Sequence, residues 1–419
     1  MTEDKELIRI HGAKNSALAI IAATLLSKGI WSLNNIPMIA DVCVQFDILR
    51  QFNVKIKQIK EYDWEIDTTN MSIIENIDFS KNIRGSYYFM GVLNAYASRT
   101  IHKLSNGCNI DDRTIDIHLD FFSQIGVSCE IKDGDYVLTR NEWPKKKEIE
   151  YIFKKKTVGG TVNAILSTVV SDKKVLLKDC AIDPYITDLI NFLNKAGSSI
   201  HQDGDRIYIN GTHHLNPIGY TIMFDPIEAG TYLAAIALLS KKPMRIGPMI
   251  PSDIGSFFDY LIKIGVKIKN LGDCIYEVTP IEFYSNFCIA TQPFPGIYTD
   301  LQLFAALLGL RSNKISQITE NIMLKRFEYL NEIKKIGYQF KISDNVITIF
   351  PSSDLNKDNL ELVGTDLRGT MAILLACLMK TNSFNNIIIH KSYFIDRGYY
   401  DYKANLSKID ERISKIRFM

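Results

Sequence analysis

The sequence predicts an α/β protein made of six copies of one βαβαβ-type unit, grouped into two lobes of three. The first observation is a repeat: five amphipathic helix patterns end at a Gly or Asn, and these residues recur at separations of 73, 71, 68 and 72. The second is a set of six apolar segments, rich in small residues, that have the composition of buried helices. The third is the length, because 419 residues exceed what one hydrophobic core usually supports.

Each unit is expected to begin with a buried helix. The six matching segments share continuous apolarity and cover residues 16–29, 85–99, 160–173, 229–242, 300–313 and 368–382. None of them has a charged face that would need water along the whole helix. We therefore expect these first helices inside the lobes, and the amphipathic second helices on the outside.

The second helices precede strand patterns. They cover residues 46–53, 119–126, 189–197, 257–265 and 329–337, and each is followed by the beginning of a β-hairpin pattern, such as VKIKQI at 54–59. Their last residues are Asn53, Gly126, Gly197, Gly265 and Gly337. Gly and Asn tolerate the left-handed backbone with which many helices end.

The chain is expected to cross from one lobe to the other at Asp225-Pro226, between the third and fourth units. The predicted lobes are residues 13–224, with units one to three, and residues 1–12 plus 225–419, with units four to six. Chance similarity among α/β segments is the alternative, but it does not account for five helix ends that stay in register along the chain.

Composition excludes several classes of function. The net charge of +2 gives no electrostatic reason to expect nucleic acid or an anionic membrane as a partner. Seven scattered cysteines without a CxxC pair, together with the polar N-terminus MTEDKE, indicate a reduced, cytoplasmic protein. His118 and His213-His214 have no companions at ligand spacing, so no metal is expected.

Polar residues gather at two equivalent places in the units, the start of the first helix and the turn before the second. The helix starts carry Lys14-Asn15, Arg84, residues 157–160, Glu228, Asp300 and Arg368. The turns carry residues 108–116, Asp183, Lys325-Arg326 and Asp396-Arg397. A helix N-terminus disfavours a basic side chain and attracts an anion, so this placement predicts a ligand with phosphate and carboxylate groups.

A single arginine at a turn is more often a solvated or ion-paired surface group than a ligand. Five at equivalent places favour the anion site: Arg84, Arg113, Arg326, Arg368 and Arg397. Cys108 lies in a polar loop near Arg113, where a thiolate is favoured, and we interpret it as reactive rather than as an incidental exposed thiol.

Five motifs together resemble one family. They are Gly12-Ala13-Lys14-Asn15, Gly107-Cys108 followed by Arg113 and residues 115–118, Tyr298-Thr299-Asp300, residues 365–368, and residues 395–399. The chain resembles the UDP-N-acetylglucosamine 1-carboxyvinyltransferases of the enolpyruvyl transferase superfamily, which includes EPSP synthase, from about residue 10 to 400. The resemblance implies two inside-out α/β barrel (prism) lobes with the active site in the cleft between them.

The resemblance also implies roles for individual residues. Phosphoenolpyruvate would be held by Lys14, Arg113, Arg326, Arg368 and Arg397. The nucleotide sugar would be contacted by Asn15, Arg84, Arg113, Thr114, Ile115, Asp116, Ile117, Lys155, Thr157, Val158, Gly159, Asp300 and Ile322. The catalytic residues would be Cys108, Asp300, Lys14 and Arg397, without metal or organic cofactor.

The implied reaction moves the carboxyvinyl group of phosphoenolpyruvate to the 3-hydroxyl of UDP-N-acetylglucosamine and releases phosphate. It is the first step of peptidoglycan precursor synthesis. Cys108 would protonate the methylene carbon or add to C2, and Asp300 would take the hydroxyl proton. The partners are these two small molecules, and the oligomeric state is left open.

Four features depart from the family pattern. Asp112 stands where glycine is usual, Thr114 where proline is usual and Tyr185 where an acidic residue is common, and the N-terminus is shorter by roughly one strand. Asp112 would repel a diphosphate. Two alternatives therefore remain open: an enolpyruvyl transferase for another nucleotide acceptor in secondary metabolism, and a non-catalytic paralogue that binds a nucleotide sugar.

Overall fold

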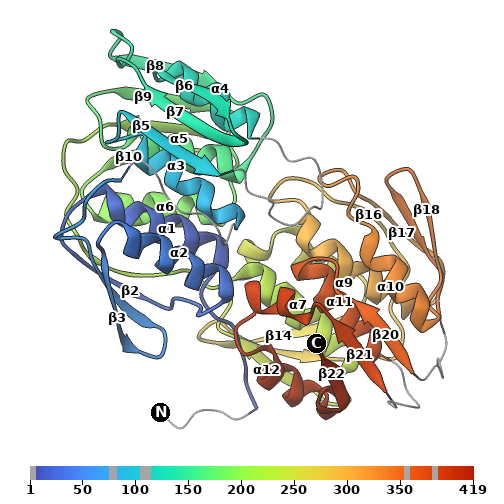
Figure 1. Cartoon of the computed structure of the whole chain (residues 1–419). Coiled ribbons are helices and arrows are strands. Elements are labelled where there is room, and N and C mark those ends of the chain that lie inside the picture. Colours follow the sequence, from blue (N-terminus) through green and yellow to red (C-terminus); the bar gives the residue numbers. More distant parts are fainter. Residues whose placement is uncertain (1–5, 75–82, 104–114, 353–358, 380–385) are drawn as a thin grey trace. The chain divides into compact units, whose positions relative to one another are not determined.

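The computed structural model describes residues 6–74, 83–103, 115–352, 359–379 and 386–419. The chain divides into two compact units, one formed by residues 12–223 and the other by residues 1–11 and 224–419. Among the described residues, each unit is mixed α/β and contains three small sheets (Figure 1). The predicted α/β class is confirmed.

The unit of residues 12–223 contains six α-helices among its described residues. They are α1 (Lys14–Ala23), α2 (Ala40–Gln51), α3 (Tyr88–Leu93), α4 (Asp116–Gln124), α5 (Val158–Thr168) and α6 (Pro184–Lys195). Nearly all of α1, α3 and α5 is buried, because these helices are apolar on every side. Helix α3 packs against both α1 and α5.

Its sheets each contain one antiparallel hairpin. The first has the order β12-β2-β4-β3, with β2 (Ile30–Asn34), β3 (Lys55–Lys60), β4 (Asp63–Asp67) and β12 (Gly219–Thr221). The second is β5-β7-β6, with β5 (Arg99–Lys103), β6 (Val127–Lys132) and β7 (Asp135–Arg140). The third is β10-β11-β9-β8, with β8 (Glu148–Ile152), β9 (Lys174–Lys178), β10 (Ser199–Asp203) and β11 (Arg206–Asn210).

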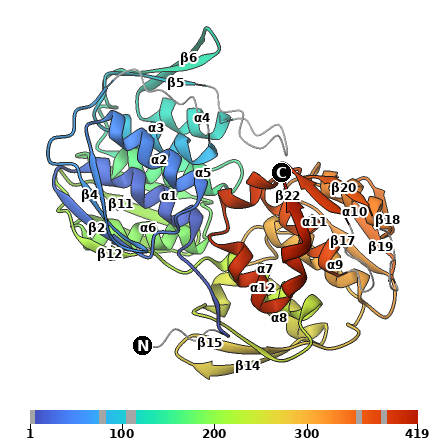
Figure 2. The ribbon, with the colours of Figure 1, turned by 60° about the horizontal axis from the view of Figure 1, so that its bottom comes forward.

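The other unit has the same kind of interior. Its α-helices are α7 (Pro226–Leu239), α8 (Ser256–Lys263), α9 (Thr299–Leu310), α10 (Glu328–Ile336), α11 (Leu367–Leu378) and α12 (Tyr402–Ile409). Every residue of α7 and α11 is buried, as is every residue of α9 except Asp300. Helix α9 packs against both α7 and α11, and β14 and β15 form a ribbon beside α8 (Figure 2).

The third sheet of this unit differs from the other two, because all of its strands are parallel. The first is β1-β13-β15-β14, with β1 (Ile8–Arg9), β13 (Met244–Gly247), β14 (Lys267–Gly272) and β15 (Ile275–Thr279). The second is β16-β17-β19-β18, with β16 (Cys288–Ala290), β17 (Ser316–Thr319), β18 (Phe340–Ser343) and β19 (Val346–Ile349). The third is β20-β21-β22, all parallel, with β20 (Leu360–Val363), β21 (Ile387–His390) and β22 (Ile416–Phe418).

The repeat shows in the backbone angles. All five predicted helix ends have positive φ: Asn53 at 59°, Gly126 at 81°, Gly197 at 106°, Gly265 at 110° and Gly337 at 119°. These residues therefore end the second helices as the pattern predicted.

One predicted element differs in the structure. The helix predicted over 85–99 is shorter: it forms as the 3-10 turn η2 (Arg84–Tyr87) and α3, ends at Leu93, and is followed by β5 from Arg99. The C-terminal residues Ile416–Phe418 form β22, parallel to β21. No helix among the described residues has the length and apolarity that a membrane span needs.

Candidate active site

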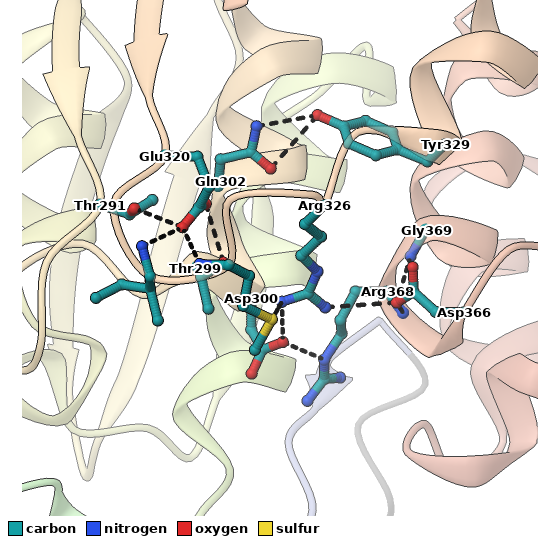
Figure 3. Close-up of polar contacts among 12 residues, drawn as sticks. Thr291, Thr299, Asp300, Gln302, Glu320, Arg326, Tyr329, Asp366, Arg368 and Gly369 are labelled. Carbon is teal, nitrogen blue, oxygen red and sulfur yellow. Dashed lines mark hydrogen bonds and ion pairs between the residues drawn. The ribbon is translucent and has the colours of Figure 1, made fainter. Parts of the chain in front are cut away.

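Three predicted site residues meet in the unit that contains residues 224–419. Asp300 lies in the first turn of α9, Arg368 in the first turn of α11, and Arg326 in the turn before α10. Arg326 Nη1 is 2.7 Å from Asp300 Oδ1, and Arg368 Nε is 4.0 Å from the same oxygen (Figure 3). Side chains from three separate segments thus converge on one carboxylate.

A second carboxylate completes the cluster. Asp366 caps α11, because its Oδ1 accepts hydrogen bonds from the backbone N–H groups of Arg368 and Gly369 at 3.0 and 3.2 Å. The same oxygen is 3.4 Å from Arg326 Nη2. Arg326 is therefore held between Asp300 and Asp366.

Both guanidinium groups are buried and charged. Arg326 is 3% exposed and Arg368 4%. Burial by itself disfavours the charged form, but Asp300 and Asp366 outweigh it and raise the pKa of Arg326. For Arg368 burial is likewise outweighed, by Tyr399, Asp300 and Asp225, and its pKa is also raised.

Each arginine keeps a donor available. Among the described residues, Arg326 Nε and Arg368 Nη1 are buried and have no hydrogen-bond partner. Buried N–H groups are rarely left unpaired, so two such donors in one cluster indicate that an anion belongs here. A planar carboxylate suits guanidinium donors, which bind it by parallel hydrogen bonds.

The aromatic ring of Tyr399 lies against the guanidinium group of Arg368. The Arg368 Cζ lies 4.8 Å from the centre of the Tyr399 ring, and the Tyr399 hydroxyl is 2.8 Å from Thr231 Oγ1 on α7. Burial raises the pKa of Tyr399 to about 12, so its hydroxyl is neutral at neutral pH. The ring thus offers its face to the cation while its hydroxyl is held by α7.

In the unit of residues 12–223, Lys14 and Asn15 begin α1. Lys14 Nζ is 2.6 Å from Asp41 Oδ2 on α2, and both side chains are largely buried. The next residue, Ser16, donates a hydrogen bond to the buried Asp188 of α6, which also accepts one from Tyr220 at 2.7 Å. These contacts fix the first turn of α1, which carries Lys14, the residue predicted to bind phosphate.

The other predicted nucleotide-sugar residues of this unit lie at the starts of α4 and α5. Ile115 to Ile117 form the start of α4, while Thr157 caps α5 through a 3.4 Å hydrogen bond from the Gly160 N–H. Val158 and Gly159 follow in the first turn of α5, and Lys155 is exposed just before it.

Asn163 links α5 to the start of α4 and to α3, and it was not among the residues predicted from the sequence. Its Nδ2 is 2.7 Å from His118 Nδ1 on α4 and donates to the Tyr87 carbonyl at 3.0 Å, while its Oδ1 accepts from the Gly91 N–H at 3.0 Å. The signal in the sequence was an asparagine inside the apolar segment GTVNAILST, and in the structure its amide is fully buried. Asn163 thereby holds α3, α4 and α5 together beside the predicted binding residues.

Several predictions are placed only in part. Cys108, Arg113 and Thr114, with Asp112, lie outside the described residues, and Arg84 is described only by its backbone at the start of η2. Arg397 ends the 3-10 turn η4 (Ser392–Arg397) and is half-buried.

Tyr185, one of the departures, is buried in α6. Within the described part of the chain, His, Cys, Asp and Glu form no group of three or more that could hold a metal ion.

The family comparison covers almost the whole chain. Residues 4–406 match the model of the family EPSP synthase (3-phosphoshikimate 1-carboxyvinyltransferase). A UDP-N-acetylglucosamine 1-carboxyvinyltransferase of Pelagibacter ubique is 33% identical over 98% of this chain and 97% of its own. The enzyme named UDP-N-acetylglucosamine 1-carboxyvinyltransferase 3 of Caldanaerobacter subterraneus is 33% identical over 98% of this chain and 96% of its own.

Solved structures share the fold. The enolpyruvyl transferase NikO of Streptomyces tendae has a TM-score of 0.84 at 21% identity, covering 96% of this chain and 94% of its own. EPSP synthase of Acinetobacter baumannii has a TM-score of 0.70 at 12% identity, with the same coverage of 96% and 94%.

Proposed function

Since the chain belongs to the EPSP synthase (3-phosphoshikimate 1-carboxyvinyltransferase) family, and within it to the UDP-N-acetylglucosamine 1-carboxyvinyltransferases, we propose that it makes the enolpyruvyl ether of UDP-N-acetylglucosamine. Phosphoenolpyruvate donates the carboxyvinyl group, the sugar 3-hydroxyl accepts it, and phosphate leaves. The reaction is the first step of peptidoglycan precursor synthesis and takes place in the cytoplasm.

The buried arginine pair carries this proposal. Arg326 and Arg368 each have an N–H without a partner among the described residues, within a cluster that also contains Asp300. In the proposed complex these two arginines bind the carboxylate of phosphoenolpyruvate, while Lys14, Arg113 and Arg397 bind its phosphate. The positive groups stabilise the charge on the donor as its C2 centre becomes electron-poor.

The chemistry divides between an acid and a base. Cys108 delivers a proton to the methylene carbon, and the sugar oxygen bonds to C2 as Asp300 takes the hydroxyl proton. The C2–O bond to phosphate then breaks, inorganic phosphate leaves, and the Cys108 thiolate takes a proton back from the methyl group, which restores the double bond. Removing one cationic contact should raise the barrier by about 2 to 4 kcal/mol, as for other preorganised donors to a developing charge.

Most of the residues assigned to the nucleotide sugar lie in the other unit: Asn15, Arg84, Arg113, Thr114, Lys155 and the starts of α4 and α5. In the proposed complex, Asp300 and Ile322 of the unit of residues 224–419 contact it as well. We propose that the two units are inside-out lobes of three repeats and that both contribute to one catalytic centre once substrates bind. No metal or organic cofactor takes part in this scheme.

Covalent labelling tests the donor half of the proposal. Fosfomycin, an epoxide that mimics phosphoenolpyruvate, should add to Cys108 if that thiol lies beside the anion site. Intact-mass and peptide analysis should show one adduct on Cys108 and none in Cys108→Ala. Labelling spread over other cysteines, with Cys108 unmodified, would contradict the placement of the thiol.

A further inference from the structure

Glu320 is a buried carboxylate that no predicted role uses. It follows β17, its side chain is fully buried, and no ion pair joins it to a cation among the described residues. Four donors surround it instead. Oε1 accepts from Thr291 Oγ1 at 2.8 Å and from the N–H groups of Ile322 and Met323 at 2.8 and 2.9 Å, and Oε2 accepts from Thr299 Oγ1 at 2.9 Å.

These hydrogen bonds join two parts of the active-site cluster. Ile322 and Met323 lie in the turn that leads to Arg326. Thr299 immediately precedes Asp300 in α9, and its side chain points to Glu320 (Figure 3). The same turn is tied down a second time, because the Asn321 N–H donates to Thr291 Oγ1 at 2.8 Å. One carboxylate thus connects the turn that carries Arg326 with the helix start that carries Asp300.

We propose that Glu320 is a positioning residue, which keeps the turn of residues 321–326 in register with the start of α9 during the reaction. The inference rests on the proposed function. In the structure Arg326 Nη1 bonds Asp300 at 2.7 Å, and that contact alone would also hold the turn in place. When Arg326 takes the substrate carboxylate and Asp300 accepts a proton, the contact weakens.

The Glu320 hydrogen bonds do not involve either reacting group. They therefore hold Ile322 and Arg326 at the same distance from Asp300 while the Arg326–Asp300 ion pair changes. A displacement of about 1 Å in a reacting group can cost on the order of 100-fold in rate, so such a support has a kinetic consequence. A carboxylate suits the task because its two oxygens can accept from both segments at once.

Two variants separate positioning from general stability. Glu320→Ala removes all four hydrogen bonds, whereas Thr299→Val removes only the link to α9 and leaves both turn amides bonded to Glu320. Both should lower kcat by roughly 10- to 100-fold. Glu320→Gln should recover most of the rate, because its carbonyl oxygen still accepts from the turn amides and Thr299 can accept from its NH₂ group.

Ser312→Ala is the matched control. Ser312 is a buried hydroxyl at the opposite end of α9, where it donates to the carbonyls of Gly309 and Lys314. Its loss should lower thermal stability without changing kcat. If Glu320→Ala and Thr299→Val lose stability as Ser312→Ala does but keep the wild-type kcat, the positioning role is wrong.

Hydrogen exchange gives a readout that does not depend on the acceptor. The amides of Ile322 and Met323 should be protected in the wild type and in Thr299→Val, and should exchange faster in Glu320→Ala. If the wild type releases no phosphate with any acceptor, the proposed function fails, and exchange alone then decides on Glu320. Unchanged exchange in Glu320→Ala would overturn the inference.

Discussion

At the scale of single residues, Arg326 and Arg368 are buried charges whose hydrogen bonds are only partly satisfied among the described residues. Arg326 and Arg368 lie in the protein interior because Asp300 and Asp366 offset the cost of burying them. Two of their donors remain without a partner among the described residues. Two such donors beside two carboxylates favour the binding of an anion here.

Asp300→Asn tests the assigned base. The amide oxygen can still accept from Arg326, but the side chain can no longer take a proton, so kcat should fall by about 10²- to 10⁴-fold in steady-state phosphate release. Asp366→Asn, a second carboxylate-to-amide change in the same cluster, should lose much less activity because Asn also caps helices well. Equal losses would mean that the cluster needs the charge of Asp300, not its basicity.

The sequence predicted the charged members of this cluster but not the residues that hold them in place. Asp300, Arg326 and Arg368 could be predicted because charged residues recur at equivalent helix starts and turns. Glu320, Asp366 and Asn163 act through contacts between segments far apart in the chain, and no periodicity reports such contacts. A polar residue inside an apolar helix was the one available signal, and only Asn163 gave it.

His102 makes stability depend on pH. It is 1% exposed in β5, and burial lowers its pKa from 6.5 to about 3. Between these values the unfolded chain binds a proton that the folded chain does not, so stability is present above pH 6.5 and is lost as pH falls. The free energy of unfolding in urea should decrease by up to about 1.4 kcal/mol per pH unit from this residue.

The control is His102→Gln, which cannot titrate. Its unfolding free energy should change less steeply with pH between about pH 6 and 4, a window inside the shift that burial causes. Parallel curves for the two proteins would show that His102 is protonated in the folded state.

At the scale of elements, the fold follows from the repeat. The five helix ends at Asn53, Gly126, Gly197, Gly265 and Gly337 all have positive φ, as their residue types predicted. The prediction was less accurate for the helix expected over 85–99, because that segment runs into a strand. Helix α3 ends at Leu93, and β5 begins at Arg99 and pairs with β7.

Gly197→Ala tests the backbone requirement at a helix end. Its φ is 106°, and an added Cβ would come no closer than 3.6 Å to another atom, so the cost is conformational rather than steric. Urea unfolding should show a loss of about 1–2 kcal/mol.

Gly219→Ala is the matched control in the same unit. It lies in β12 without positive φ, and its nearest atom would be 3.9 Å away, so its stability should change by no more than about 0.5 kcal/mol. Similar losses in both variants would show that Gly197 is not needed for its backbone angle.

At the scale of the whole molecule, two observations support an enolpyruvyl transferase. One is family membership, and the other is the arginine cluster, in which two buried N–H groups have no partner among the described residues. Two of the four departures from the family pattern, Asp112 and Thr114, lie outside the described residues, in the stretch assigned to the acceptor. The identity of the acceptor is therefore what an experiment should test first.

The most direct measurement is phosphate release from phosphoenolpyruvate with UDP-N-acetylglucosamine, with uridine monophosphate and shikimate 3-phosphate in parallel and mass detection of the products. The account predicts the enolpyruvyl ether of UDP-N-acetylglucosamine and no product from the other two acceptors. Product from another acceptor alone would make Asp112 and Thr114 a change of specificity, and an absence of product from all three would contradict the assignment of an active transferase.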